Sequence, residues 1–482
     1  MKNKVLITTA ISYTNGEPHV GHLYEIILAN FYKRLYSLLG NETKLLTGTD
    51  EHGKKIEIKA KELNITPKEL CDKYSNSFIE MNKKINSEYD YFIRTTDRNH
   101  IKLVQENLLL SANNNDLYLA NYKGYYDVVN ECFVSSKEVE DNNFTNPINN
   151  TKYTIVDEEN FMFKLNKHKD NILKTLDKIY PIEFKTQILN RVENLEDLSI
   201  SRVNLNWGID FPNRLNKQSG NSHKVYVWFD ALLNYITGCT VKYGNVVPDK
   251  IIHIIGQDIL WFHSVIYPAI LNSTNKTKYN PTHIITHGMI LDNNGNKISK
   301  SLGNTIDINE LLKEIDIEAL KLYFILENNI GQNINFDVSK VKEKYNSLII
   351  NQYGNLAQRL LPLCNKVQDK INLSTKFNNI DFCCEVLEIE NKLPDITIFK
   401  KLINRELDRG NKYITENRIW EKEEDELVKS LVIPLRCLFN ASILLDCICP
   451  NIVSKIRAEF GLDEKGEINI KDYKKHVIFN RI

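Results

Sequence analysis

Two histidines and two lysines have the residue types and the spacing that most strongly indicate chemistry. His19 and His22 lie three residues apart shortly after a β-branched run, and Lys297 and Lys300 lie three residues apart between two glycines. The histidines would share one face of a first helical turn, where unpaired N–H groups and the helix dipole attract anions. The lysines have flexible stems that can follow charge as it develops on a phosphate. Either motif alone is weak, because surface histidines and charged turns are common, but together they favour a triphosphate site.

The sequence around the histidines predicts a strand, a helix and a second strand in succession. The helix is expected to begin near His19, to continue with apolar residues at helical spacing and to end near Gly40. Four apolar runs are expected as buried strands: Val5–Thr9, Thr43–Thr47, Val225–Asp230 and Ile251–Gly256. This alternation predicts an α/β fold with a Rossmann-like, doubly wound parallel sheet, whose ligands bind at the carboxyl ends of the strands.

The α/β pattern is interrupted and later replaced along the chain. Residues 117–223 show short strands, Asn-rich loops and one helix around Ile172 to Ile179, which predicts an inserted connective domain. From about Val338 the apolar residues are spaced by three and four, which predicts an all-α helical bundle. The expected boundaries are residues 1–116 and 224–275 for the two halves of the α/β domain, 117–223 for the insertion, 276–337 for a linker domain with the lysine loop, and 338–482 for the helical domain.

Composition limits the partners and the compartment. The 482 residues suffice for about three domains. Lys plus Arg number 62, as do Asp plus Glu, so a nucleic acid partner would have to be met by a local basic surface. The nine cysteines are scattered and predict no disulfide framework. The N-terminus enters a strand without room for a signal or transit peptide, and no apolar run is expected to span a bilayer, so a soluble, cytoplasmic protein is expected.

The pair His283 and His287 has a spacing that can hold zinc when it lies on a helix. The residues between them are β-branched, which favours a strand instead. In a strand the two imidazoles would be about 13 Å apart, which is too far for one ion. No zinc is therefore expected at this pair.

The two phosphate motifs, in this order, resemble the HIGH and KMSKS elements of class I aminoacyl-tRNA synthetases. Over nearly its whole length the chain is similar to methionyl-tRNA synthetases of the bacterial and organellar type. The resemblance implies an enzyme of protein biosynthesis that activates L-methionine with ATP to methionyl-adenylate and pyrophosphate, and then transfers methionine to the terminal ribose of tRNA(Met). It also implies ATP and Mg²⁺ as cofactors. The residues that would stabilise the phosphate charge are His19, His22, Lys297, Lys300 and, near the reacting phosphate, Arg202.

The resemblance assigns further residues to the substrates and makes the helical bundle an anticodon-binding domain. Asp50 would hold the substrate ammonium, and an aromatic pocket would suit the polarizable thioether. The residues implied for methionine are Ile11, Tyr13, Asp50, Trp228, Tyr235, Ile259 and His263. Those implied for ATP are His19, His22, Gly256, Asp258, Lys297 and Lys300. Those implied for the anticodon are Asn355, Arg359 and Trp420, whose indole could stack on an unpaired base or, alternatively, pack in the core.

Two departures from the family pattern bear on metal and on tRNA. Many relatives carry a zinc knuckle in the insertion, where this chain has Asp127, Asn130, Asn146 and Asn149 at the ligand positions. Amide oxygens are poor zinc ligands beside thiolate and imidazole, so a knuckle-shaped hairpin without metal is expected. Ile419 stands where the family usually has proline, so the local turn before Trp420 stays open. Since no appended tRNA-binding domain follows the helical region, a monomer is expected.

Three other interpretations remain open. A class I synthetase for leucine, isoleucine or valine would need a long editing insertion, for which residues 117–223 are short, and the cysteine enzyme would need zinc-binding thiolates. A non-catalytic tRNA-binding paralogue would not need both phosphate motifs. A small-molecule nucleotidylyltransferase could share the histidine motif but would have no use for the anticodon-like helices. Exchange of pyrophosphate into ATP, tested with each amino acid, separates these hypotheses.

Overall fold

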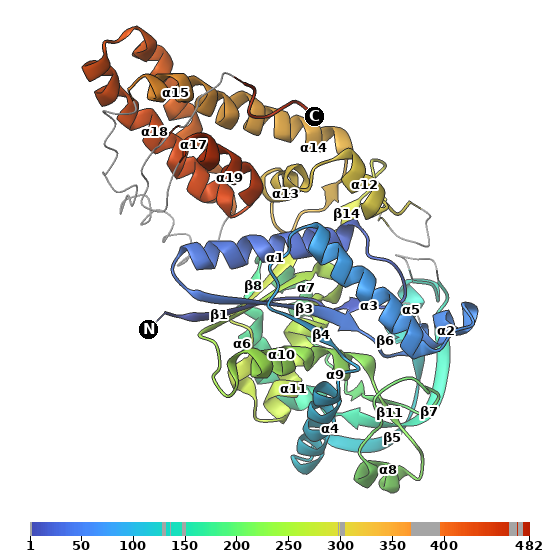
Figure 1. Cartoon of the computed structure of the whole chain (residues 1–482). Helices are drawn as coiled ribbons and strands as arrows, with labels where there is room; N and C mark the ends of the chain where they lie inside the picture. Colours follow the sequence, from blue (N-terminus) through green and yellow to red (C-terminus); the bar gives the residue numbers. More distant parts are fainter. Residues whose placement is uncertain are drawn as a thin grey trace. The chain divides into compact units, whose positions relative to one another are not determined.

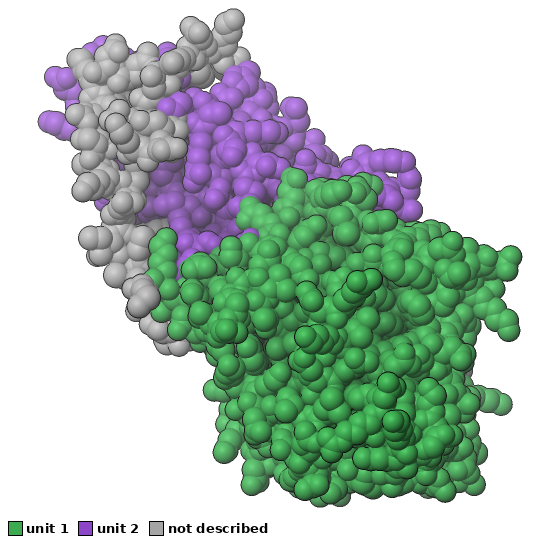
Figure 2. All heavy atoms as spheres, turned by 60° about the horizontal axis from the view of Figure 1, so that its bottom comes forward, with its two compact units in different colours: residues 1–29, 42–289, 298–305 green, residues 30–41, 290–297, 306–482 purple. Residues whose placement is uncertain are grey.

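The computed structural model divides into two compact units. It describes residues 2–127, 132–134, 136–146, 151–296, 298, 304–367, 396–461, 470 and 476–482. Unit 1 consists of residues 1–29, 42–289 and 298–305, and unit 2 consists of residues 30–41, 290–297 and 306–482 (Figure 2, green and purple).

Unit 1 is built on a seven-stranded sheet in which every pair of neighbouring strands is parallel. The strand order is β2-β3-β1-β12-β13-β8, and β4 also pairs with β3. The strands are β1 (Lys4–Thr9), β2 (Ser12–Tyr13), β3 (Glu42–Asp50), β4 (Tyr91–Arg94), β8 (Ile179–Tyr180), β12 (Lys250–Gly256) and β13 (His283–His287). The predicted parallel α/β sheet is confirmed, and so is the strand at His283–His287.

Helices cover both faces of this sheet, which explains why its central strands read as continuous apolar runs. Figure 1 shows the start of α1 (Val20–Leu38) and α3 (Pro67–Lys84) on one face, and α10 (Asn234–Tyr243) and α11 (Tyr267–Ser273) on the other. Unit 1 also contains α2 (Lys54–Glu62), α4 (Arg98–Asn113), α6 (Lys169–Leu176), α7 (Glu183–Val192), α8 (Asn213–Ser219) and α9 (Val227–Leu232). Short 3₁₀ and π turns lie at η1 (Leu165–His168), η2 (Gln257–Ile259), η3 (Phe262–Ile266) and η4 (Thr277–Tyr279).

The bounds of α1 agree with the sequence prediction. The helix starts one residue after His19 and ends at Leu38, two residues before Gly40. Gly40 has a φ of +85°, a left-handed conformation that glycine adopts at helix ends without strain. Its N–H donates to the carbonyl of Ser37 (3.0 Å), which closes the last turn.

The insertion contains a separate antiparallel sheet in the order β6-β5-β7-β9. Its strands are β5 (Leu117–Asp127), β6 (Cys132–Val134), β7 (Thr154–Phe163) and β9 (Leu198–Ser199), with α5 (Ser136–Asp141) between β6 and β7. The expectation of a single helix within residues 117–223 is wrong, because α5, α7 and α8 accompany α6 there. These three helices have only 6, 10 and 7 residues, so they give little periodicity to detect. Strand β8 lies in the same stretch and pairs with β13 of the parallel sheet. The domain boundaries stay predictions.

The strand predicted at Val225–Asp230 is also wrong. Lys224–Val225 forms β11, which pairs antiparallel with β10 (Ser201–Arg202), and the chain then enters α9. All residues of α9 except Trp228 are buried. A short apolar run buried on every side cannot be distinguished from a buried strand by periodicity.

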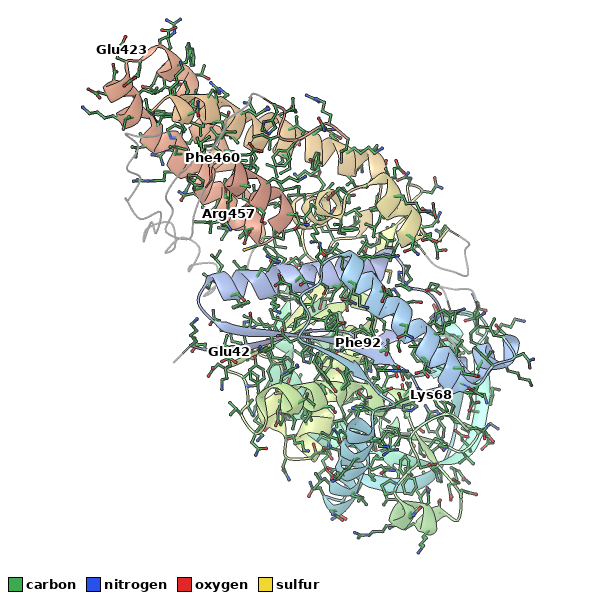
Figure 3. All side chains as sticks on the ribbon, in the orientation of Figure 1. Glu42, Lys68, Phe92, Glu423, Arg457 and Phe460 are labelled. Atoms are coloured by element: carbon green, nitrogen blue, oxygen red, sulfur yellow. The ribbon has the colours of Figure 1, made fainter. Side chains whose placement is uncertain are left out.

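Unit 2 is mainly helical, as predicted for the C-terminal region (Figure 1, yellow to red). Its elements are β14 (Ile290–Leu291), α12 (Ile308–Glu314), α13 (Ile317–Leu326), β15 (Ile334–Asn335), α14 (Val338–Tyr345), η6 (Asn346–Gly354), α15 (Asn355–Lys366), α17 (Ile396–Glu416), η8 (Ile419–Glu421), α18 (Glu424–Asp446) and α19 (Pro450–Glu459). Aromatic residues join neighbouring helices: the rings of Phe439 of α18 and Phe460, just after α19, have centroids 5.8 Å apart. Phe460 is labelled in Figure 3.

Helix α18 is long and apolar enough to cross a membrane by length and composition, so the expectation that no run could do so is wrong. Its most apolar window is 67% buried, however, and α18 packs against α15 and α17. This is the pattern of the central helix of a bundle, which is apolar on several sides because neighbours surround it.

Candidate active site

The two histidines of the first motif are held by backbone groups at the start of α1. The N–H of His19 donates to Nδ1 of His22 (3.1 Å), and the N–H of Gly21 donates to Nδ1 of His19 (3.1 Å). The two ring centroids are 3.8 Å apart. Because Nδ1 accepts in both rings, the proton of each neutral imidazole lies on Nε2. A Cβ on Gly21 would lie 3.0 Å from Cε1 of His19, so glycine leaves room for the first ring.

A carboxylate that the sequence analysis missed lies one turn further along α1. Oε1 of Glu25 accepts from the N–H of Ala10 (2.8 Å), and Oε2 pairs with Nε2 of His287 (3.2 Å). Burial raises the pKa of Glu25. Burial alone would lower the pKa of His287, but the hydrogen bond and charge of Glu25 raise it above its ordinary value. The three-residue spacing from His22 to Glu25 was the available signal, since it places both on one helical face.

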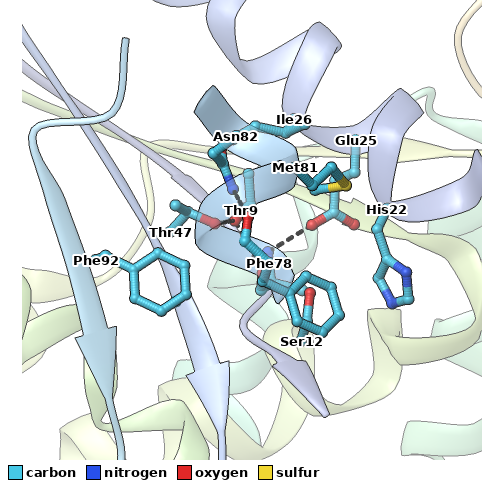
Figure 4. Close-up of a pocket in the computed structure, with 12 residues that line it drawn as sticks. Thr9, Ser12, His22, Glu25, Ile26, Thr47, Phe78, Met81, Asn82 and Phe92 are labelled. Carbon is cyan, nitrogen blue, oxygen red and sulfur yellow. Dashed lines mark hydrogen bonds between the residues drawn. The ribbon is translucent and has the colours of Figure 1, made fainter. Parts of the chain in front are cut away.

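A pocket of about 280 Å³, open to solvent, lies beside His22 (Figure 4). Its walls come from the ends of β1 and β3, from β4 and from α1 and α3. The lining residues are Thr9, Ala10, Ser12, His22, Glu25, Ile26, Thr47, Gly48, Phe78, Met81, Asn82 and Phe92. Phe78 meets the ring of His22 edge-on at 5.0 Å. The pocket lies at the carboxyl ends of parallel strands, where α/β folds bind ligands.

Two residues predicted for methionine, Tyr235 and His263, form a buried neutral pair. Nδ1–H of His263 donates to the carbonyl of Ile259 (2.9 Å), so Nε2 is free to accept from the hydroxyl of Tyr235 (2.7 Å). Burial lowers the pKa of His263 to about 4 and raises the pKa of Tyr235. Both groups therefore stay uncharged near pH 7, which suits an apolar ligand.

The predicted aromatic wall contains a stacked ring pair. Trp228 on α9 lies parallel to Phe262 on η3, with ring centroids 3.6 Å apart and planes 4° apart. Phe262 is not among the residues predicted for methionine, although it directly precedes His263. Ile11 and Ile259 are partly buried against the same apolar core, which also contains Tyr235. The structure thus brings the apolar residues predicted for methionine into one core.

Asp50 ends β3 and is buried. Its carbonyl accepts from the N–H of Thr14 (3.1 Å), and the carbonyl of His52 accepts from the hydroxyl of Tyr13 (2.7 Å). The turn after β3 is therefore fixed to the end of β2. This arrangement presents a carboxylate at the carboxyl edge of the sheet.

The residues predicted for the ribose lie at the end of β12. This strand ends at Gly256, and Asp258 follows in η2. A Cβ on Gly256 would lie 2.7 Å from Oδ1 of Asp258, so any larger residue here would displace the Asp258 carboxylate. The same Cβ position would lie 3.7 Å from Cε1 of His287, so Asp258 and His287 approach Gly256 together. The charge of Asp258 contributes to the raised pKa values of Glu25 and His287.

The remaining phosphate residues are only partly described. Lys297 and Lys300 lie outside the described residues. The chain before them makes a turn in which Oδ1 of Asp292 accepts from the N–H groups of Asn294 and Asn296 (2.9 Å each). Arg202 at the end of β10 donates to the carbonyl of Ser201 (2.7 Å). Its guanidinium also lies over the rings of two tyrosines, Tyr126 (5.3 Å) and Tyr226 (4.5 Å).

Comparisons with known proteins decide the family. The sequence matches the family described as tRNA synthetases class I (M) over residues 5–144 and 130–361. It is 34% identical to the methionine–tRNA ligase of Helicobacter pylori strain J99, over 95% of this chain and 73% of that protein. It is 30% identical to that of Mycoplasmopsis pulmonis, over 98% and 96% of the two chains. The structure matches Mycobacterium tuberculosis methionyl-tRNA synthetase in complex with methionyl-adenylate with a TM-score of 0.84 and 28% identity, over 97% of this chain and 96% of that chain. The chain belongs to the methionyl-tRNA synthetases.

The residues that the methionyl-tRNA synthetase resemblance assigns to the anticodon lie near the end of α17. Asn355 donates to Oδ1 of Asn411 (3.0 Å), and Arg359 donates to the carbonyl of Asn411 (3.0 Å) and to the hydroxyl of Thr415 (2.8 Å). The two residues on α15 therefore share one face, as predicted. Trp420 follows on η8 and is 45% exposed, so it is not an ordinary core residue.

Two of the four positions that the family resemblance assigns to a metal-free knuckle lie within the described residues. Nδ2 of Asn146 donates to Oδ2 of Asp127 (2.6 Å), and both side chains are buried. Asn130 and Asn149 lie outside the described residues. A direct hydrogen bond thus joins two of the positions that the resemblance assigned to the knuckle. Zinc-free folding of the hairpin stays a prediction.

Proposed function

We propose that the chain is a methionine–tRNA ligase that works in two steps at one site. It would activate L-methionine with ATP to give methionyl-adenylate and pyrophosphate, and then transfer the methionyl group to the terminal ribose of tRNA(Met). Membership of the methionyl-tRNA synthetases supports this activity. The observation that carries it in this chain is the neutral, buried Tyr235–His263 pair, because uncharged groups suit a neighbouring side chain without charge.

The first step needs positioning and charge stabilisation rather than a general base. The methionine carboxylate is already a nucleophile and attacks the α-phosphate in line, with pyrophosphate as the leaving group. His19 and His22 would direct their Nε2–H groups to the phosphates, because backbone N–H groups occupy both Nδ1 atoms. We propose the same role for Lys297 and Lys300, and a place near the reacting phosphate for Arg202. Gly256 and Asp258 would hold the ribose, since they end a central strand.

Mg²⁺ is proposed as the accompanying ion and would neutralise charge on the ATP phosphates. Among the described residues, no group of three or more His, Cys, Asp or Glu side chains is placed to hold a metal ion. The phosphates themselves would therefore supply most of its ligands, which is usual for Mg²⁺ with nucleotides.

Methionine would be held at both ends. Asp50, buried at the end of β3, would bind its ammonium group. The side chain would lie among Ile11, Tyr13, Trp228, Tyr235, Ile259 and His263. Recognition of tRNA(Met) through Asn355, Arg359 and Trp420, a cytoplasmic location and a monomeric state complete the proposal.

The test is the amino-acid-dependent exchange of pyrophosphate into ATP, run with each of the twenty amino acids. We expect exchange with methionine and, at saturating enzyme, attachment of methionine to tRNA(Met). Exchange with leucine, isoleucine, valine or cysteine in preference to methionine would instead identify a synthetase for another apolar amino acid. Absence of exchange together with binding of tRNA would identify a non-catalytic paralogue.

A further inference from the structure

A buried carboxylate on α9 lies between two histidines that are distant in the sequence. Oδ2 of Asp230 accepts from Nδ1 of His52 (2.7 Å), and Oδ1 accepts from Nε2 of His100 (2.7 Å). Asp230 is 1% exposed, and both imidazoles are buried. We call these three residues the Asp230 cluster. Each carboxylate oxygen has an imidazole partner, as a buried charge requires.

The cluster connects elements that carry the residues proposed for methionine. His52 lies two residues after Asp50, and Asp230 lies two residues after Trp228 on α9. His100, in the first turn of α4, bonds through Nδ1 to the hydroxyl of Thr237 on α10 (2.9 Å). The cluster therefore joins the turn after β3 to both helices of the aromatic wall.

The turn after β3 is already fixed on its other sides. The carbonyl of Glu51 accepts from the indole N–H of Trp207 (2.5 Å). The carboxylate of Glu51 is fully buried and accepts two hydrogen bonds from Arg94 (2.5 and 3.0 Å). These contacts hold the turn to Arg94 at the end of β4 and to the segment that contains Trp207. The side chain of His52 holds the same turn to α9.

Asp230 is held as a carboxylate, which keeps its hydrogen bonds to His52 and His100 in place near pH 7. Burial alone would raise its pKa, but the charges and hydrogen bonds of His52 and His100 lower it below the ordinary value. The carboxylate therefore stays ionised near pH 7 and accepts from both imidazoles. A buried network of this kind is rigid when every member is paired.

We propose that Asp230 is a positioning residue for the amino-acid site, which sets the separation between the carboxylate of Asp50 and the aromatic wall of Trp228 and Tyr235. The inference rests on the proposed function. An α-amino acid with an ammonium at one end and an apolar side chain at the other must span this separation. The Asp230 cluster therefore selects the length of the side chain, in addition to supporting affinity.

The experiment compares Asp230→Asn with Asp116→Asn in the pyrophosphate exchange assay. Asp116 is a matched control, because it is equally buried and pairs with Lys167 (2.5 Å) and His168 (3.5 Å). Active sites are counted by the burst of adenylate formed, so that misfolded protein does not affect the constants. Methionine, the longer ethionine and the shorter homocysteine serve as substrates.

Asp230→Asn should raise KM for methionine by roughly tenfold or more, with KM for ATP nearly unchanged, and should reduce the preference for methionine over ethionine and homocysteine. Asp116→Asn should change neither. An unchanged methionine KM in folded Asp230→Asn, or equal effects in both variants, would overturn the proposal. If the unmodified enzyme exchanges with no methionine at all, it is the proposed function that fails.

If Asp230→Asn does not fold, His52 provides the same test at the edge of the cluster. His52→Ala should raise the methionine KM, and His52→Asn should restore much of the wild-type value, because the asparagine Nδ2–H takes the position of the Nδ1–H that donates to Asp230. Loss of thermal stability in both without a change in KM would show a structural role only, and would overturn the proposal.

Discussion

Trp420→Ala tests whether the helical unit reads tRNA. The side chain is 45% exposed on η8, which follows Arg418 in a left-handed conformation (φ 45°). A base stacked on the indole is worth about 1–3 kcal/mol. This corresponds to a fall of about 5- to 150-fold in kcat/KM for aminoacylation of tRNA(Met).

Ile419→Ala is the matched control, since Ile419 is the preceding residue but is fully buried. Truncating a buried isoleucine costs about 2–5 kcal/mol of folding stability through lost contacts and a cavity. Trp420→Ala should lower the melting temperature less than Ile419→Ala, because nearly half of the indole is already in water. The two variants thus separate recognition from packing.

Two activities are measured on the same preparations of each variant. Aminoacylation with varied tRNA(Met) gives kcat/KM, and pyrophosphate exchange without tRNA gives the rate of adenylate formation. Trp420→Ala should lose aminoacylation and keep exchange, since adenylation does not involve the anticodon. Loss of both activities with a large loss of stability would refute the reasoning in favour of a packing role. Normal activity in both would place anticodon recognition elsewhere.

Three further outcomes are expected. Lys300→Ala should lower the adenylation rate by orders of magnitude with a smaller change in methionine affinity, measured by pre-steady-state exchange; a near-normal rate would remove Lys300 from the mechanism. Elemental analysis should find well under one zinc per chain, and chelators should leave the fold intact, since Asp127 and Asn146 are hydrogen-bonded to each other; stoichiometric zinc would contradict this. Burial lowers the pKa of His263 in the folded state to about 4. Between pH 6.5 and pH 4 the imidazole is therefore protonated only in the unfolded chain, so the free energy of unfolding falls as the pH falls through this range. The glutamine of His263→Gln can still accept from Tyr235 but does not titrate, so this variant should lose up to about 3 kcal/mol of the pH dependence of the free energy of unfolding, measured by urea denaturation. An unchanged pH dependence would contradict a lowered pKa of His263.

The parts of the fold that the sequence predicted are those with a strong local signal. β1 and β12 are apolar and β-branched because helices cover both faces of the sheet. α1 has apolar residues at helical spacing and a glycine just past its end. α9 gave the wrong prediction because burial on all sides removed the periodicity that distinguishes a helix from a strand.

The parts of the site that the sequence could not predict depend on pairs that are far apart in the chain. Glu25 and His287 are separated by 262 positions, and His52 and Asp230 by 178. Each of these residues has an ordinary local environment in the sequence, and only the order of the strands brings the partners together. Family resemblance supplied residues that would touch substrate, but neither of these two buried pairs.

The π-helical turn η3 (Phe262–Ile266) places a constraint on the length of the chain rather than on its composition. It contains Phe262 and His263 and continues directly into α11. A π turn contains one residue more than an α-helix would use for the same path. Deleting one residue here would restore regular α-helical hydrogen bonds, but would rotate the preceding side chains by about 100° relative to α11. A deletion would therefore break the hydrogen bond between His263 and Tyr235 even as the helix itself became more regular. Evolution can accept substitutions in this segment more readily than deletions.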